Sequence, residues 1–164
     1  MADKQDGIPF SNSPQSHDKI GNRKTDKKEL AKSAFENANE FLSGAGLIFM
    51  HDIRLIQVAS VNLAFACELY LKAMLFELDI DFDRIHRIIE LYRLLPEKYQ
   101  KKIKANVHFK YEKEDNFELV LEEISNTFVF LRYSHERNAV VSNWDGLAAI
   151  SKAIMEIARE VVEK

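Results

Sequence analysis

The fold of this chain is decided by one stretch, Val58 to Phe76, which reads VASVNLAFACELYLKAMLF. Its plainly polar residues are Ser60, Asn62, Glu68 and Lys72. A helix that is apolar on almost every side is normally buried by other elements. Its length would also suit a membrane span, but Glu68 and Lys72 lie well inside it, and charges at that depth in lipid are costly. The stretch therefore predicts a buried central helix, about residues 53–78, in a soluble bundle.

Glu68 and Lys72 are four residues apart with the acid first, which is the favourable order for an ion pair along a helix. Two interpretations are open. A half-exposed pair within the helix would contribute roughly 0.3–0.5 kcal/mol. A buried pair would need further polar partners from another helix, because removing one partner of a buried pair costs several kcal/mol.

The composition indicates one globular domain. Hydrophobic residues make up 46% of the 164 residues, which is enough for a core and argues against general disorder. The formal net charge of −3 gives no global sign of nucleic-acid binding. Cys67 is the one cysteine, so no disulfide can form within the chain, and we expect a packing role for it. The N-terminus lacks the apolar segment of a signal peptide, so we expect a cytoplasmic protein without membrane attachment.

Residues 1–24 are polar, contain scattered Gly, Pro and Ser, and show no helical periodicity, so they are predicted to be a flexible tail. Residues 25–164 are predicted to form a single helical domain. Its first helix should begin near Asp26 and be ended or loosened by Gly44 and Gly46. Asp83 suits the N-cap of a helix over about 84–95, and a short helix should follow over 97–104.

Two further helices have start signals of the same kind. Asp115 precedes a helical stripe that runs past Arg132, and Ser142 precedes a last stripe that extends to Val161. No stretch favours a strand. The sequence therefore predicts an all-α, up-and-down bundle of about five to six helices around the central one.

Common enzyme motifs are missing from the sequence. There is no G-x-x-x-x-G-K phosphate loop and no H-E-x-x-H helix, and a single cysteine excludes a Cys-rich zinc site. The five histidines are far apart. We therefore expect no metal and no cofactor.

The stretch LRYSHERN, residues 131–138, holds the candidate catalytic group. Arg132, His135 and Glu136 share one helix face if the helix extends that far. Arginine can hold a phosphate, and histidine can move a proton near neutral pH, as metal-independent RNA cleavage requires. The alternative is a solvated helix end with an ion pair between Arg132 and Glu136. Two interpretations are also open for the lysines of 98–104, which could form either a solvated helix face or an RNA-binding groove.

Three stretches together resemble the HEPN family of bacterial and archaeal helical domains. They are NLAFACELYLKAMLF at 62–76, HRIIELYRLLP at 86–96 and FVFLRYSHE at 128–136, in the family's order and within a similarity covering about residues 26–160. The resemblance implies a bundle of four to six helices, often paired as a homodimer. It also implies toxin–antitoxin or abortive-infection systems, with an antitoxin or nucleotidyltransferase as partner. The residues that match the family pattern are Asn62, Glu68, Lys72, His86, Arg132, Tyr133 and Glu136, which the resemblance marks as a polar cluster or binding surface.

Many members of this family resemble metal-independent ribonucleases whose hallmark is Arg, four to six residues, then His. This chain departs from the hallmark, because only two residues separate Arg132 from His135 and no His follows Arg137-Asn138. We therefore expect a non-catalytic HEPN-like domain that binds a partner protein or RNA. The alternative is a metal-independent ribonuclease that uses Arg132 and His135, with Glu136 orienting them.

Overall fold

The computed structural model describes residues 26–108, 117–132 and 144–164, with the backbone alone for 127–132. The described part of the chain contains six α-helices and a 3₁₀ turn, and none of it is strand. The predicted all-α class and the number of helices are therefore confirmed. In chain order the elements are α1 (Lys27–His51), η1 (Ile53–Leu55), α2 (Ile56–Glu77), α3 (Ile88–Leu94), α4 (Glu97–Asn106), α5 (Phe117–Arg132) and α7 (Trp144–Val162).

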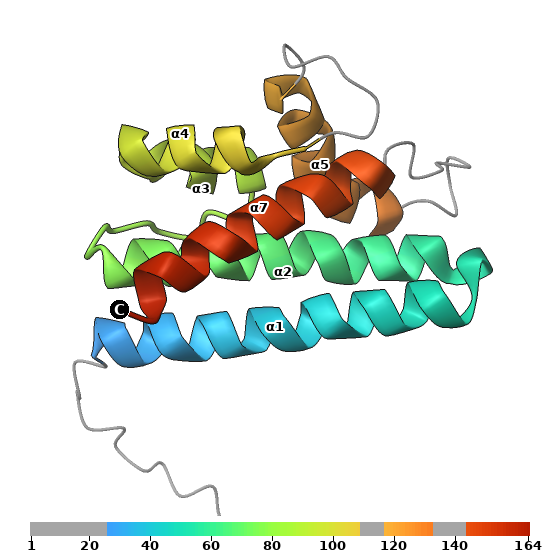
Figure 1. Cartoon of the computed structure of the whole chain (residues 1–164), viewed down its shortest axis with the longest axis horizontal. Coiled ribbons are helices and arrows are strands. Elements are labelled where there is room, and N and C mark those ends of the chain that lie inside the picture. Colours follow the sequence, from blue (N-terminus) through green and yellow to red (C-terminus); the bar gives the residue numbers. More distant parts are fainter. Residues whose placement is uncertain (1–25, 109–116, 133–143) are drawn as a thin grey trace, which may run out of the picture.

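Helix α2 is the centre of the bundle. In Figure 1 α1 and α2 lie side by side as an antiparallel hairpin that turns at η1, and α7 runs obliquely over α2. Helices α3 and α5 also pack against α2, while α4 packs against α7. Four helices thus surround α2, as its nearly all-round apolar sequence predicts.

The burial of α2 follows its residue types. Ala59, Ala66 and Ala73 are completely buried and recur every seven residues, so neighbouring helices can approach closely along one side. Leu71 and Met74 are completely buried as well. The helical stretch Ile53–Glu77 is long and apolar enough to cross a membrane, but 67% of its most apolar 18-residue segment is buried inside the fold. That degree of burial is typical of a helix in the core of a bundle.

The prediction that Gly44 and Gly46 end or loosen the first helix was wrong. Helix α1 continues through both glycines to His51, and Asp52 closes it with its backbone N–H donating to the Ile48 carbonyl oxygen. Glycine inside a helix costs about 1 kcal/mol relative to alanine. That cost is outweighed because the other face of α1 packs on α2, with Ala45 buried between the two glycines.

The predicted start of the helix at 84–95 was also wrong. Helix α3 begins only at Ile88, and the Asp83 side chain is 94% exposed beside Arg84. The chain before it leaves α2 through a Schellman-type end: Asp79 takes a left-handed φ of 56°, and the Ile80 N–H donates to the Leu75 carbonyl oxygen over 2.9 Å. This end turns the backbone away from the direction of α2. The chain then stays non-helical up to Ile88, so Asp83 caps no helix.

Several predictions fall outside the described residues. The tail at 1–24 and the caps at Asp115 and Ser142 are among them. The division of the chain into a tail and a domain beginning near residue 25 stays a prediction.

Candidate functional site

The first candidate site is a polar cluster on α2, formed by Glu68, Lys72 and His86. The Lys72 Nζ donates to Glu68 Oε1 over 2.7 Å, and the His86 Nδ1 lies 2.9 Å from the same oxygen. Glu68 is buried, with its side chain 10% exposed, and Lys72 is nearly as buried at 16%. The pair is therefore joined by a third group from outside α2. His86 supplies that group from the segment between α2 and α3.

One carboxylate oxygen, Glu68 Oε1, holds both of the other members of this cluster. It is shared by the Lys72 ammonium and the His86 imidazole. The Lys72 Nζ also lies 6.0 Å from the centre of the Phe82 ring, whose face attracts cations. The His86 side chain is 72% exposed. The cluster thus presents one imidazole at the surface, held by a buried carboxylate, and this arrangement can bind a polar ligand group.

Asn62 lies on the same helix but is not part of the hydrogen-bonded group. It is half-buried, and among the described residues no hydrogen bond joins it to Glu68, Lys72 or His86. The structure therefore brings together three of the four family-pattern residues on this side of the bundle.

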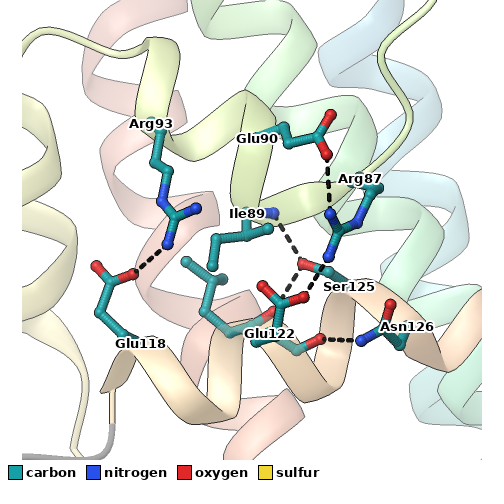
Figure 2. Close-up of polar contacts among 9 residues, drawn as sticks. Arg87, Ile89, Glu90, Arg93, Glu118, Glu122, Ser125 and Asn126 are labelled. Atoms are coloured by element: carbon teal, nitrogen blue, oxygen red, sulfur yellow. Dashed lines mark hydrogen bonds and ion pairs between the residues drawn. The ribbon is translucent and has the colours of Figure 1, made fainter.

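A second polar group, next to His86 in sequence, joins α3 to α5 (Figure 2). Arg87 pairs with Glu90 over 2.9 Å and with Glu122 of α5, and Arg93 pairs with Glu118 of α5 over 3.2 Å. All five side chains are roughly half exposed, so these pairs individually contribute little to stability. Together they fix which face of α5 meets α3.

One buried serine completes this junction. The Ile89 backbone N–H donates to Ser125 Oγ over 2.8 Å, and the Ser125 hydroxyl donates to the Leu121 carbonyl oxygen over 2.7 Å (Figure 2). Ile89 is the second residue of α3, so its N–H has no carbonyl partner within the helix. Ser125 of α5 therefore caps α3 from a neighbouring helix, while the N-cap residue Arg87 makes no side-chain cap bond.

Sequence reasoning missed the junction between α3 and α5. The available signal was weak: Glu118, Glu122 and Ser125 recur at spacings of four and three, which places them on one side of α5. Nothing in that spacing shows which helix they face. The partner becomes visible only when α3 is placed beside α5.

The candidate catalytic residues lie at the edge of the described chain. Arg132 is the last residue of α5, and its side chain is outside the described part. Tyr133, His135 and Glu136 are outside it as well. Their roles stay predictions.

Cys67 lies at the contact between α2 and α7. Its Sγ is 2.9 Å from Ser151 Oγ, and burial raises the pKa of the Cys67 thiol to about 12. A thiol with that pKa is protonated at neutral pH and is a poor nucleophile. Cys67 therefore serves packing.

Two of the four lysines of α4 pair with carboxylates. Lys101 pairs with Glu97 over 2.7 Å, and Lys102 pairs with Glu160 of α7 over 2.6 Å. The hydrogen bond to Glu160 raises the pKa of Lys102, and the same contact lowers the pKa of Glu160. Each of these carboxylates offsets a positive charge that an RNA groove would need.

Metal ligands do not gather anywhere in residues 26–108, 117–132 and 144–164: no three His, Cys, Asp or Glu side chains there are placed to share an ion. His135 lies outside those residues.

The second candidate site is an apolar surface at the turn of the hairpin formed by α1 and α2. Five large apolar side chains are exposed there, and we call them the hairpin tip: Leu47, Met50, Ile53, Leu55 and Val58. Their exposed fractions run from 42% to 85%. Exposed apolar surfaces of this kind mark interaction sites when they are contiguous.

Comparisons with known proteins gave one match. A model of the HEPN domain matches residues 31–164 of this chain. A search of curated proteins and a search of solved structures each gave no match.

Proposed function

Because the chain belongs to the HEPN domain family, we propose that it is a non-catalytic binding module for a partner protein or RNA. The setting is a prokaryotic defence or toxin–antitoxin system, in which the domain works as a cytoplasmic homodimer. An antitoxin or a nucleotidyltransferase is the kind of protein partner that the family suggests. The hairpin tip is the observation that carries this proposal.

The hairpin tip supports binding because it leaves apolar area in water. Met50 is 85% exposed and Leu47 is 71% exposed, although the same helix buries Ala45 against the core. Covering an apolar side chain of this size stabilises a complex by about 1.5–3 kcal/mol when burial is complete. Several such side chains at one place are what a protein interface needs at its centre.

The chain lacks an Arg followed after four to six residues by a His, and this absence from the sequence supports the non-catalytic part of the proposal. His86, the histidine that the structure places against a carboxylate, is adjacent to Arg87 in the sequence, and Arg87 is held by Glu90 and Glu122. An arginine held between two carboxylates is poorly suited to bind phosphate.

The charges of the described surface favour a protein over RNA as the first partner to seek. Lys101 and Lys102 of the most basic stretch pair with carboxylates. On such a face Glu97 and Glu160 lie beside these lysines, and their negative charges would repel RNA phosphates.

The second candidate function is a metal-independent ribonuclease that uses Arg132 and His135, with Glu136 orienting them. The observation in its favour is that α5 ends at Arg132, the residue expected to hold the phosphate. With only two residues between Arg132 and His135, both can approach one phosphodiester if the helical path continues.

Incubation of purified protein with a mixed RNA pool in EDTA separates the two functions. Wild type, His135→Ala and Arg132→Ala are compared at equal concentration, and intact RNA is measured on a denaturing gel. We expect no cleavage by any of the three proteins. Cleavage by wild type that both substitutions abolish would overturn the non-catalytic proposal and establish the ribonuclease. Cleavage that persists in both variants would indicate a contaminating nuclease, which repurification removes.

A further inference from the structure

The hairpin tip is built from three consecutive elements. Leu47 and Met50 lie three residues apart at the end of α1, Ile53 and Leu55 lie in η1, and Val58 follows in α2. Residues three apart share a helix face, so Leu47 and Met50 point to one side of α1. In Figure 1 this region is the end of the hairpin where α1 turns into α2.

The inner side of the same turn is already filled. Ala45 is buried, and the Phe49 ring stacks on Trp144 at the start of α7, with the ring centres 4.6 Å apart and the planes 10° apart. Helix geometry directs Met50 away from that side, since the two neighbours are about 100° apart around the axis. The five exposed side chains therefore have no place in the core of their own chain.

The turn itself carries no net charge. Asp52 accepts from the Arg54 backbone N–H over 2.9 Å, and the Arg54 guanidinium binds the same carboxylate through Nε and Nη2 at 2.7–3.0 Å. These two are the only Asp, Glu, Lys or Arg residues between positions 41 and 67. The tip is thus an uncharged apolar face whose one cation and one anion neutralise each other.

We infer that the hairpin tip is the self-association face of this chain, and that its occupant is the hairpin tip of a second copy. This inference deepens the proposed homodimer by naming the surface that forms it. An isologous interface uses the same patch on both subunits, so the patch must match itself. An apolar face without net charge does so, because two copies meet without like-charge repulsion even though each chain carries −3.

The properties of the tip fit a second copy better than a lipid surface. Adsorption to anionic membranes relies on lysine and arginine around the apolar residues. Arg54 is the tip's one such residue, and Asp52 already binds it. A stable dimer buries about 800 Å² on each partner, with apolar residues at the centre and polar ones at the rim. The five apolar side chains supply such a centre, and the exposed polar residues Arg54 and Gln57 adjoin them in the sequence.

The test compares Met50→Asp with Leu119→Asp. Both residues are exposed, at 85% and 64%, but Leu119 lies on α5 outside the tip, so its substitution adds the same charge away from the inferred interface. Molar mass is measured by light scattering after size exclusion, and circular dichroism checks that each variant keeps its helices. We expect wild type and Leu119→Asp at twice the chain mass of 19.0 kDa, and Met50→Asp at 19.0 kDa.

A crosslinking measurement provides a second readout. Met50→Cys places one exposed thiol in the tip, while the native Cys67 is completely buried. A flexible bismaleimide should link Met50→Cys chains into dimers and leave wild-type and Leu119→Cys chains unlinked. Linked dimers of Met50→Cys at low protein concentration, together with a monomeric Met50→Asp protein, would support the inference.

The outcomes separate this inference from the proposed function. A dimeric wild type with a dimeric Met50→Asp variant would overturn the tip as the interface and leave the homodimer intact. A monomeric wild type at all concentrations tested would overturn both the tip and the homodimer. The result of the RNA cleavage assay does not depend on either outcome.

Discussion

Replacing Ser125 by alanine should destabilise the whole domain, although the substitution removes a single oxygen atom. The hydroxyl accepts the Ile89 N–H at 2.8 Å and donates to the Leu121 carbonyl oxygen at 2.7 Å. Ser125 is 6% exposed and Ile89 is 1% exposed, so water has little access to the amide when the hydroxyl is lost. The change therefore leaves a buried donor at the first turn of α3 without its partner.

The size of this effect follows from which bonds are lost. A buried donor left unsatisfied costs about 1–3 kcal/mol in the free energy of unfolding. The Leu121 carbonyl group also belongs to the helical hydrogen-bond ladder of α5, so losing the hydroxyl there costs less. Alanine is the better helix former by up to about 0.5 kcal/mol, which offsets part of the loss.

Ser60→Ala is the matched control for this prediction. Ser60 is also a buried helical serine whose hydroxyl donates to the carbonyl oxygen four residues earlier, that of Ile56, over 2.7 Å. It does not cap another helix. Because the change in helix propensity is the same in both variants, subtracting their effects isolates the bond from Ile89 to Ser125.

Urea denaturation followed by circular dichroism at 222 nm measures both variants. We expect Ser125→Ala to lower the free energy of unfolding by about 1–3 kcal/mol, and Ser60→Ala to change it by less than about 0.5 kcal/mol. Equal effects in the two variants would refute the claim that Ser125 caps α3. A Ser125→Ala protein as stable as wild type would refute it as well.

Three further predictions concern single positions in the described helices. Gly46→Ala should raise the free energy of unfolding by about 0.5–1 kcal/mol, because a Cβ there meets nothing within 4 Å; a melting temperature unchanged or lowered in thermal denaturation would contradict this. Glu68→Gln should lower the free energy of unfolding, measured by urea denaturation, by about 1–3 kcal/mol, because it leaves the buried Lys72 without a carboxylate. His86→Ala should lower it by less than about 1 kcal/mol, because His86 is 72% exposed. The reverse order would show that Glu68 is not the centre of the cluster. Burial raises the pKa of the Cys67 thiol from 9.0 to about 12, so the thiol ionises at a lower pH in the unfolded chain than in the folded one. The free energy of unfolding should therefore fall as the pH rises from about 9 toward 12. The fall between pH 8 and pH 11 should be smaller in Cys67→Ala, and an equal fall in both proteins would exclude this contribution.

The helices themselves were largely predictable from the sequence. Apolar spacing is a local property, so the stretch 58–76 predicts a buried central helix, and the stripe that extends to Val161 predicts a helix that α7 confirms. Pro96 predicts the start of the short helix that α4 confirms. The likeness to the HEPN family was also readable from three short motifs, and the family match over residues 31–164 confirms it. Local patterns suffice in these cases because each helix has to bury its own apolar stripe.

The helix boundaries that failed had their causes elsewhere in the chain. Gly46 signals a helix end locally, but packing of α1 on α2 carries the helix past it. Asp83 signals a helix start, but the cap that α3 uses is Ser125, 36 residues away from Ile89. Cap rules weigh only neighbours in sequence, so a cap supplied by another helix is invisible to them.

By itself the sequence determined the all-α class, the central helix and the family, because helical periodicity and residue polarity are properties of neighbouring residues. The tertiary structure decided the partners of those residues. Only the packed bundle brings His86 to the Glu68 carboxylate and leaves the hairpin tip in water after the core has filled. The physical reason is that burial and pairing depend on which distant segments pack against one another, and the residue spacing along one helix does not specify its neighbours.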